Sequence, residues 1–296
     1  MELWIPVTLA AAFFQNLRSM LQKSLKGRLS TWGTTATRFV YAAPLAALLF
    51  ALVAADRGGV PQAPGRFFLF GMAGGLSQIV ATGLLISLFA RTNFAVANGF
   101  TKTEPLQTAV FGLVLLGDHL SAGAVMGIVV SLAGVMLVSV PGLSGNAPLR
   151  LDANAWRGIV SGGLFGLSAV AYRAASLSLP GDDVLLRSGA TLAFVTAFQA
   201  VAVLGWLALR EPAEIGRVFG AWRTAGWVGV TGMLASFGWF TAFTLQNAAH
   251  VRALGQVEVV FTLAASILFF KEHITAREVG GVALIAAGVV VLVLLR

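Results

Sequence analysis

The chain has 296 residues, of which 57% are hydrophobic and only 11% are charged. A soluble domain carries about 25% charged residues, so this composition excludes a protein whose whole surface faces water. The formal net charge of +8 is spread singly over short connections. It forms no basic stripe, so we expect no nucleic-acid partner. The chain contains no cysteine, which excludes disulfides, thiolate zinc sites and cysteine nucleophiles.

Long apolar segments, separated by charged residues, glycine and proline, predict membrane-spanning helices of about 20 residues each. Barrel strands would alternate apolar and polar residues, whereas these runs are continuous, and helices satisfy their backbone hydrogen bonds internally. The sequence therefore predicts an all-α integral membrane protein with ten transmembrane helices. In chain order we expect them at 3–23, 32–54, 67–90, 94–116, 121–140, 156–176, 184–208, 224–246, 251–270 and 277–295.

An internal repeat relates the two parts of the chain. Residues 101–121 align without a gap on residues 255–275, and this alignment places Glu104 on Glu258. Apolar composition alone does not place a glutamate on a glutamate inside two membrane spans, so we infer a duplication. The same shift also aligns Thr108 with Thr262, Asp118 with Glu272, His119 with His273, Gly127 with Gly281 and Gly134 with Gly288. We expect these four glycines to permit close helix packing.

The segment at 141–153 is polar and rich in proline and glycine, which is typical of a linker. It separates a first five-helix repeat at 1–140 from a second at 154–296. Because each repeat has an odd number of spans, the second enters the membrane with the opposite orientation. The sequence thus predicts an inverted repeat, an architecture suited to alternating access around a site near the midplane.

The pair Glu104-Pro105, the corner Leu116-Gly117-Asp118 and the glycine spacing of the next helix resemble the EamA-type family of the drug/metabolite transporter superfamily. Arg38, early in the second span, matches a position where that family often carries arginine. The second repeat departs from the pattern, with Val259 in place of the proline and Lys271 in place of the corner glycine. The resemblance implies transport of amino acids, other metabolites or drugs, often outward.

Polar residues on the first two spans are the first candidates for a transport site. Gln15, Asn16, Arg18 and Gln22 share one sector of a helix, and that sector cannot face lipid. We expect Asn16 and Arg18 to line a cavity; helix packing, or snorkelling of Arg18 to the interface, is the alternative. Arg38 lies roughly 10 Å inside its span. It could bind a substrate carboxylate, pair with a glutamate or snorkel.

The repeated glutamates are the second set of candidates. Glu104 lies roughly 15 Å inside the fourth span, near Lys102 and beside Pro105, which frees a backbone carbonyl. Gln256 and Glu258 occupy the mirror position on the ninth span. We expect these polar residues to bind substrate or couple transport to an ion; a structural ion pair between helices is the alternative.

Further candidates lie on the third and eighth spans. Gln78 and Gln246 add hydrogen-bonding groups inside the membrane. Trp239, Phe240 and Phe243 give the eighth span an aromatic face. That face could hold an aromatic or apolar substrate, although packing or lipid contact is the commoner role of such a face.

The remaining ionisable residues predict neither a metal site nor a cofactor. His119, His250 and His273 have no spacing with acids that suits metal coordination. We expect Asp118 and Glu272, at corners between spans, to cap the helices that follow them.

These features favour a secondary transporter, with export expected, of small metabolites such as amino acids or amphipathic compounds. Its partners would be the small-molecule substrate, the lipid bilayer, and protons or a counter-substrate, since the chain has no nucleotide-binding loop. An importer of the same fold is the main alternative. A membrane-embedded enzyme would need a convergent catalytic cluster, which the sequence lacks. We expect a multi-pass protein of the bacterial inner membrane.

The orientation of the chain in the membrane is set by two conflicting signals. By the predicted boundaries, six basic residues lie on the side of the termini and eleven on the other side. The excess of basic residues in cytoplasmic loops would therefore put the termini outside. The family resemblance implies cytoplasmic termini, and this is the orientation that we expect.

Overall fold

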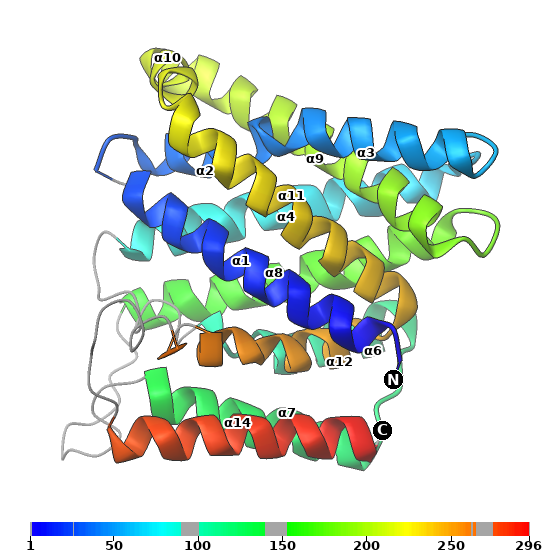
Figure 1. Cartoon of the computed structure of the whole chain (residues 1–296), viewed down its shortest axis with the longest axis vertical. Helices are drawn as coiled ribbons and strands as arrows, with labels where there is room; N and C mark the ends of the chain where they lie inside the picture. Colours follow the sequence, from blue (N-terminus) through cyan, green and yellow to red (C-terminus); the bar gives the residue numbers. More distant parts are fainter. Residues whose placement is uncertain are drawn as a thin grey trace.

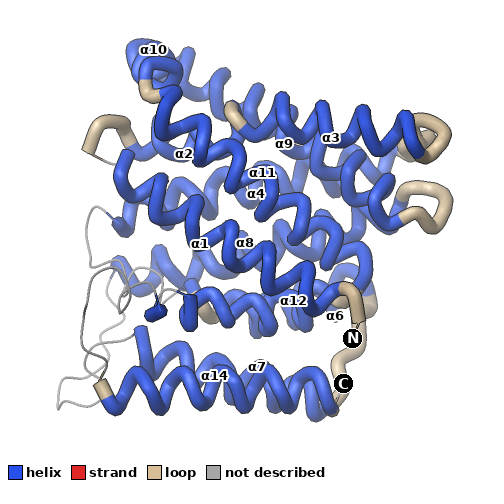
Figure 2. Tube along the Cα trace, in the orientation of Figure 1, coloured by secondary structure: helices blue, strands red, loops and turns tan. Residues whose placement is uncertain are grey.

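The computed structural model describes residues 2–25, 27–89, 101–139, 153–261, 263–264 and 275–295. These residues form helices joined by loops and contain no strand, as Figure 2 shows. The predicted linker at 141–153 lies outside the described residues except for its last position, as do Lys271, Glu272 and His273.

The first half of the chain forms six helices within the described residues. They are α1 (Trp4–Leu25), α2 (Thr31–Val40), α3 (Ala42–Asp56), α4 (Gly65–Phe89), α6 (Glu104–Leu116) and α7 (Ala122–Ser139). Three of them, α1, α4 and α7, match predicted spans closely at both ends. The span predicted at 32–54 is broken into α2 and α3 at Tyr41. Pro44, three residues later, lacks the backbone N–H that a continuous helix would bond to the carbonyl of Val40.

Within the described residues the second half forms six α-helices and one 3-10 turn. Its elements are α8 (Ala153–Ser178), α9 (Val184–Arg210), α10 (Pro212–Gly220), α11 (Trp222–Leu245), α12 (Ala248–Leu254), the 3-10 turn η1 (Gly255–Val257) and α14 (Ala276–Leu294). Helix α10 falls between two predicted spans, where a loop was expected. The helix predicted from 251 is interrupted by η1 directly before Glu258.

Four helices in the described part of the chain are long and apolar enough to cross a membrane: Thr31–Asp56, Gly65–Leu88, Val184–Arg210 and Trp222–Leu245. Outward-facing apolar side chains on these helices suit a lipid environment, because Leu52 is 62% exposed, Val201 72% and Leu209 83%. Trp206 and Trp222 are exposed near helix ends, where tryptophan is enriched at membrane interfaces.

The main helix contacts join the two halves. Helix α1 packs against α11, α4 against α8, α3 against α9 and α7 against α14. In Figure 1, α7 and α14 lie side by side at one edge of the bundle, and α3 lies near α9 at the opposite edge. Exchanging the halves converts the α1–α11 contact into the α8–α4 contact, so the packing follows the sequence repeat.

The contact between α7 and α14 is made by glycines. A methyl group at Gly127 would lie 2.7 Å from the carbonyl oxygen of Gly288, and one at Gly134 would lie 2.6 Å from that of Gly281. The predicted role of these glycines in close helix packing is confirmed. The repeat pairs Gly127 with Gly281 and Gly134 with Gly288, so the two contacts exchange when the halves are exchanged.

Candidate functional site

A small cavity lies between the two halves, lined by α1, α2, α4, α6, α8, α11 and α12 and by the residues next to α6 and η1. Its volume is ≈ 40 Å³, enough for about three water molecules. Most of the cavity lining is polar, and six of its side chains are charged: Arg18, Arg38, Lys102, Glu104, Arg252 and Glu258. Charged groups are rare inside membrane proteins and usually serve function, so we take this cavity as the candidate site.

Glu258 holds the most connected position in the cavity. Its carboxylate makes an ion pair with Lys102 and accepts a hydrogen bond of 2.7 Å from Gln15 Nε2. The Oε1 atom of Gln15 in turn accepts a hydrogen bond of 2.9 Å from Trp239 Nε1. Asn16 Nδ2 donates to the backbone carbonyl of Glu258 at 3.2 Å. Lys102 and two residues of α1 therefore contact Glu258 directly, and Trp239 of α11 contacts it through Gln15.

Glu104 has a simpler environment. Its Oε1 atom lies 2.8 Å from Arg252 Nε. The guanidinium of Arg252 also stacks over Trp239, 4.6 Å from the ring centre, and over Phe243 at 5.1 Å. Such cation–π contacts stabilise the position of an arginine side chain even when its ion pair with a carboxylate is weakened.

The two ion pairs cross between the halves. Lys102 of the first half meets Glu258 of the second, and Arg252 of the second half meets Glu104 of the first. Both acids follow a break in their helices, because Glu104 begins α6 and Glu258 follows η1. Pro105 lies in the first turn of α6, where its missing N–H disturbs nothing, so the irregular backbone precedes the acid rather than following it.

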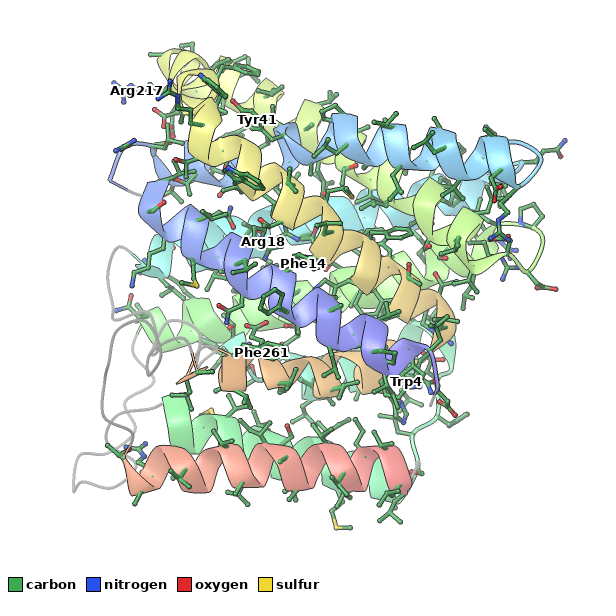
Figure 3. All side chains as sticks on the ribbon, in the orientation of Figure 1. Trp4, Phe14, Arg18, Tyr41, Arg217 and Phe261 are labelled. Atoms are coloured by element: carbon green, nitrogen blue, oxygen red, sulfur yellow. The ribbon has the colours of Figure 1, made fainter. Side chains whose placement is uncertain are left out.

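Arg18 is buried inside the bundle. It lies on α1 between the two ends of that helix (Figure 3) and is 5% exposed, so it does not snorkel to the interface. Its Nε and Nη1 atoms are buried without a hydrogen-bond partner among the described residues. Glu258 and Arg252 act on it electrostatically, one attracting and one repelling it. An arginine at a helix centre costs about 2.5–3.5 kcal/mol, which makes an incompletely bonded one a functional candidate.

Arg38 is 4% exposed on α2 and also does not snorkel. Its Nη1 donates to Thr82 Oγ1 at 3.1 Å, and that hydroxyl donates to the carbonyl of Gln78 at 2.8 Å. Among the described residues it makes no ion pair, and its charged neighbours Arg18 and Arg252 both repel it. Of the three roles open to Arg38, the described residues therefore show neither a pair with a glutamate nor snorkelling.

A neutral polar network forms another wall of the cavity. The Tyr172 hydroxyl donates to the carbonyl of Gly74 at 3.0 Å and lies 3.2 Å from Gln78 Oε1. Gln199 Nε2 lies 3.0 Å from Gln78 Oε1 and 3.2 Å from the Tyr172 hydroxyl. The predicted candidate Gln78 thus lines the cavity as part of a network that joins α4, α8 and α9.

Three predicted candidates lie beside the cavity or away from it. Asn16 binds the backbone of Glu258, and the amide of Gln256 turns back to the carbonyl of Arg252. Gln246 ends α11, where its side chain accepts from the backbone N–H of Asn247. None of the three contributes to the cavity lining. The sequence predicted how deep these three residues lie in the membrane, but it did not predict the direction in which their side chains point.

The predicted cap at the first corner is also corrected. The hydroxyl of Ser121, rather than Asp118, accepts from the backbone N–H of Ala124 at the start of α7. Asp118 instead lies 3.6 Å from Arg173 Nε. Arg173 additionally donates from Nη1 to the carbonyls of Phe243 and Gln246, at 2.8 and 2.7 Å. This arginine therefore joins α6, α8 and the end of α11.

Comparison with known proteins places this arrangement in a family. A model of the EamA-like transporter family matches residues 2–140 and matches again at residues 158–294. The chain belongs to the EamA-like transporter family. The resemblance predicted from the sequence is confirmed, and the EamA-like chain is a membrane protein with two copies of the family repeat.

A solved crystal structure is similar to the EamA-like chain, with a TM-score of 0.71 and 18% sequence identity. The match covers 97% of this chain and 95% of the other. At that identity the likeness shows the fold alone. No curated protein matches the EamA-like chain in sequence.

Several lining residues were not among the sequence candidates. Tyr172 is one of only two tyrosines in the EamA-like chain, and its position inside an apolar helix was the signal available. Arg252 is one of the six basic residues that the predicted boundaries assigned to the side of the termini, but it is 6% exposed and belongs to the cavity. Phe240 stacks on the Tyr172 ring at 4.5 Å, so the aromatic face of α11 packs inward rather than toward lipid.

Proposed function

We propose that the chain is a secondary transporter that moves a small metabolite across the bacterial inner membrane by alternating access. In this proposal its ten spans form an inverted repeat, with α2 and α3 acting as one span and α10 lying outside the spans. The cavity between the halves is the substrate site. Protons or a counter-substrate would supply the energy.

The crossed ion pairs are the observation that carries this proposal. Lys102–Glu258 and Arg252–Glu104 each join one half to the other at the cavity. In an inverted repeat, alternating access exchanges the roles of the two halves around such a midplane site. Only the two glutamates occupy equivalent positions in the repeat, but each ion pair joins one half to the other, so the two can loosen in turn as each side opens. If the only role of these residues were to pack the helices together, apolar side chains would be sufficient, and charges inside the membrane would not be required.

Contacts at the two ends of the bundle support an occluded state. At the end near the termini, Arg57 Nη1 lies 2.9 Å from Asp183 Oδ2, which joins the halves. At the other end, the backbone N–H of Ser30 donates to Glu214, and the Tyr41 hydroxyl donates to the carbonyl of Val218. Transport would require these two sets of contacts to open alternately.

We favour export over import, in line with the family resemblance, and expect amino acids or similar metabolites as substrates. The test is transport in cells that overexpress the chain, using a panel of radiolabelled amino acids and small carboxylates. Efflux from preloaded cells and uptake are measured in parallel. We expect faster efflux of at least one compound than in cells with the empty vector.

The matched control compares a variant of a cavity residue with a variant of a surface residue. Glu104→Gln should abolish the flux, whereas Asp182→Asn should leave it intact, because the Asp182 side chain is fully exposed. Faster uptake without efflux would support the importer. If no compound moves in either direction while the protein is present in the membrane, transport of these metabolites is contradicted.

A further inference from the structure

The cavity contains more positive than negative charge. Four cationic and two acidic side chains line it among the described residues, an excess of two positive charges. Lys102 and Arg252 are each paired with a glutamate. Arg18 and Arg38 supply the excess. In a medium of low dielectric constant such an excess strongly attracts an anion.

The two excess arginines have unused hydrogen-bonding capacity. Arg18 has two buried nitrogen atoms without a partner, and the one side-chain hydrogen bond described for Arg38 goes to a neutral hydroxyl. They are 5% and 4% exposed, and both line the cavity. They also repel each other. A negatively charged group placed between the two arginines would accept hydrogen bonds from their guanidinium groups. Its charge would also offset their mutual repulsion.

We propose that the cavity binds a small organic anion and that Arg18 and Arg38 hold its carboxylate or phosphate group. The guanidinium fork matches either group through paired N–H donors. This inference rests on the proposed transport function and names the substrate class. The substrate carries net negative charge, so a neutral zwitterionic amino acid or a cationic drug is a poor fit.

The aromatic residues of the cavity also favour an anion over a cation. Cationic ligands are usually held over aromatic faces. Here the faces of Trp239 and Phe243 are already covered by the guanidinium of Arg252. A cationic substrate would have to displace Arg252 and enter a site that is positive without it. An anion meets neither obstacle.

The ion pairs need not break when the anion binds. Glu104 and Glu258 keep Arg252 and Lys102, while the anion neutralises the other two arginines. The cavity of ≈ 40 Å³ is smaller than a dicarboxylate, so it must widen to admit one. We therefore expect anion binding to be coupled to opening of the contacts that join the halves.

The first test measures binding without transport. Purified wild-type protein in a non-ionic detergent is heated with succinate, glutamate, glycerol 3-phosphate or inorganic phosphate, at matched ionic strength. Glutamine and succinamide serve as neutral probes, and lysine and tetraphenylphosphonium as cationic ones. Ligands that bind the folded state raise Tm. We expect at least one organic anion to raise Tm, whereas the neutral and cationic probes do not.

The second test assigns the effect to the two arginines. Arg18→Gln and Arg38→Gln should each weaken binding of the active anion by about tenfold or more, since each removes a buried charged partner. Arg38→Lys should recover part of the affinity, because it keeps the charge but loses the fork. Arg28→Gln is the matched control, because Arg28 is exposed in the loop after α1.

The outcomes separate this proposal from transport itself. Stabilisation by neutral or cationic probes alone, or by inorganic phosphate alone, would overturn the organic-anion site. So would an unchanged affinity in both Arg18→Gln and Arg38→Gln. Flux of a neutral or cationic compound in proteoliposomes, without anion binding, would leave the transporter standing and remove the anion site. Anion binding that depends on both arginines, with no flux of any compound, would support the site and contradict transport.

Discussion

Lys102, just before α6, makes an ion pair with Glu258, which follows η1 in the other half of the chain. The equivalent glutamate, Glu104, is paired in turn with Arg252 of the second half. Each half therefore supplies one cation and one acid to the cavity, and each pair crosses between the halves. The two pairs differ in their surroundings, and this difference leads to the first prediction.

Removing the two carboxylates should have different consequences. Glu258→Gln leaves the buried Lys102 without its ion-pair partner and should lower the free energy of unfolding by about 3 kcal/mol. Glu104→Gln should cost about 1 kcal/mol, because Arg252 keeps its contacts with Trp239 and Phe243. Thermal unfolding of the purified variants in detergent measures both. Equal losses would show that the aromatic contacts do not hold Arg252.

We expect Glu104 to be the coupling residue, because fewer described groups hold it than hold Glu258. Glu104→Gln should abolish transport or make flux independent of a pH gradient while the protein still inserts and folds. Flux in proteoliposomes, with and without the gradient, measures this. Wild-type flux with wild-type gradient dependence would leave Glu104 a structural residue.

The contact between α7 and α14 should be sensitive to a single methyl group. Gly127→Ala places Cβ 2.7 Å from the backbone carbonyl of Gly288, so the helices must separate. We expect a loss of about 1–3 kcal/mol in stability. Gly280→Ala on α14 is the matched control, because its Cβ would meet nothing closer than 3.8 Å, and it should be neutral or slightly stabilising. A stable Gly127→Ala protein would mean that the two helices can move apart without cost.

Joining the halves at the end near the termini should block transport. Because the wild-type chain contains no cysteine, Arg57→Cys and Asp183→Cys can be combined in an unmodified background. A reducible bifunctional thiol reagent that links them should stop flux in proteoliposomes, and reduction should restore it. Each single variant treated in the same way should remain active. Full flux with the link intact would argue against opening at this end.

Asp183 should make stability depend on pH. Its carboxylate accepts a hydrogen bond of 2.9 Å from the backbone N–H of Leu186 at the start of α9, and this bond, followed by the charge of Arg57, lowers the pKa of Asp183 below its ordinary value of about 3.8. The stabilisation is complete above that ordinary value and is lost as pH falls through the lower pKa of the folded state.

The variant Asp183→Asn keeps a capping side chain but loses the charge. Its Tm should lie below that of the wild type at pH 7, and the gap should narrow as pH falls below about 4. Unfolding in a detergent without a titratable head group checks this. A gap that stays constant down to pH 3 would show that the Asp183 charge contributes nothing.

Part of the cavity could be predicted from the sequence, and part could not. The repeat identified Glu104 and Glu258 as equivalent, because two identical charged residues inside apolar helices stand out against their surroundings. Their partners could not be assigned. Lys102 lies two residues from Glu104 yet binds the other glutamate, and it lies in the turn before α6, which begins at Glu104. Gln246 and Gln256 have suitable depth, but their amides turn to nearby backbone groups.

The sequence by itself determined the helical class, the membrane setting, the repeat and the family, because hydropathy and repeated residues are properties of the chain read along its length. It also determined that Gly127 and Gly134 belong at helix contacts. Only the tertiary structure decided that Arg18 and Arg38 line one cavity without an ion-pair partner among the described residues, and that the two ion pairs cross between the halves. Helical periodicity sets the depth and face of a side chain, whereas its partners depend on which helices pack against that face.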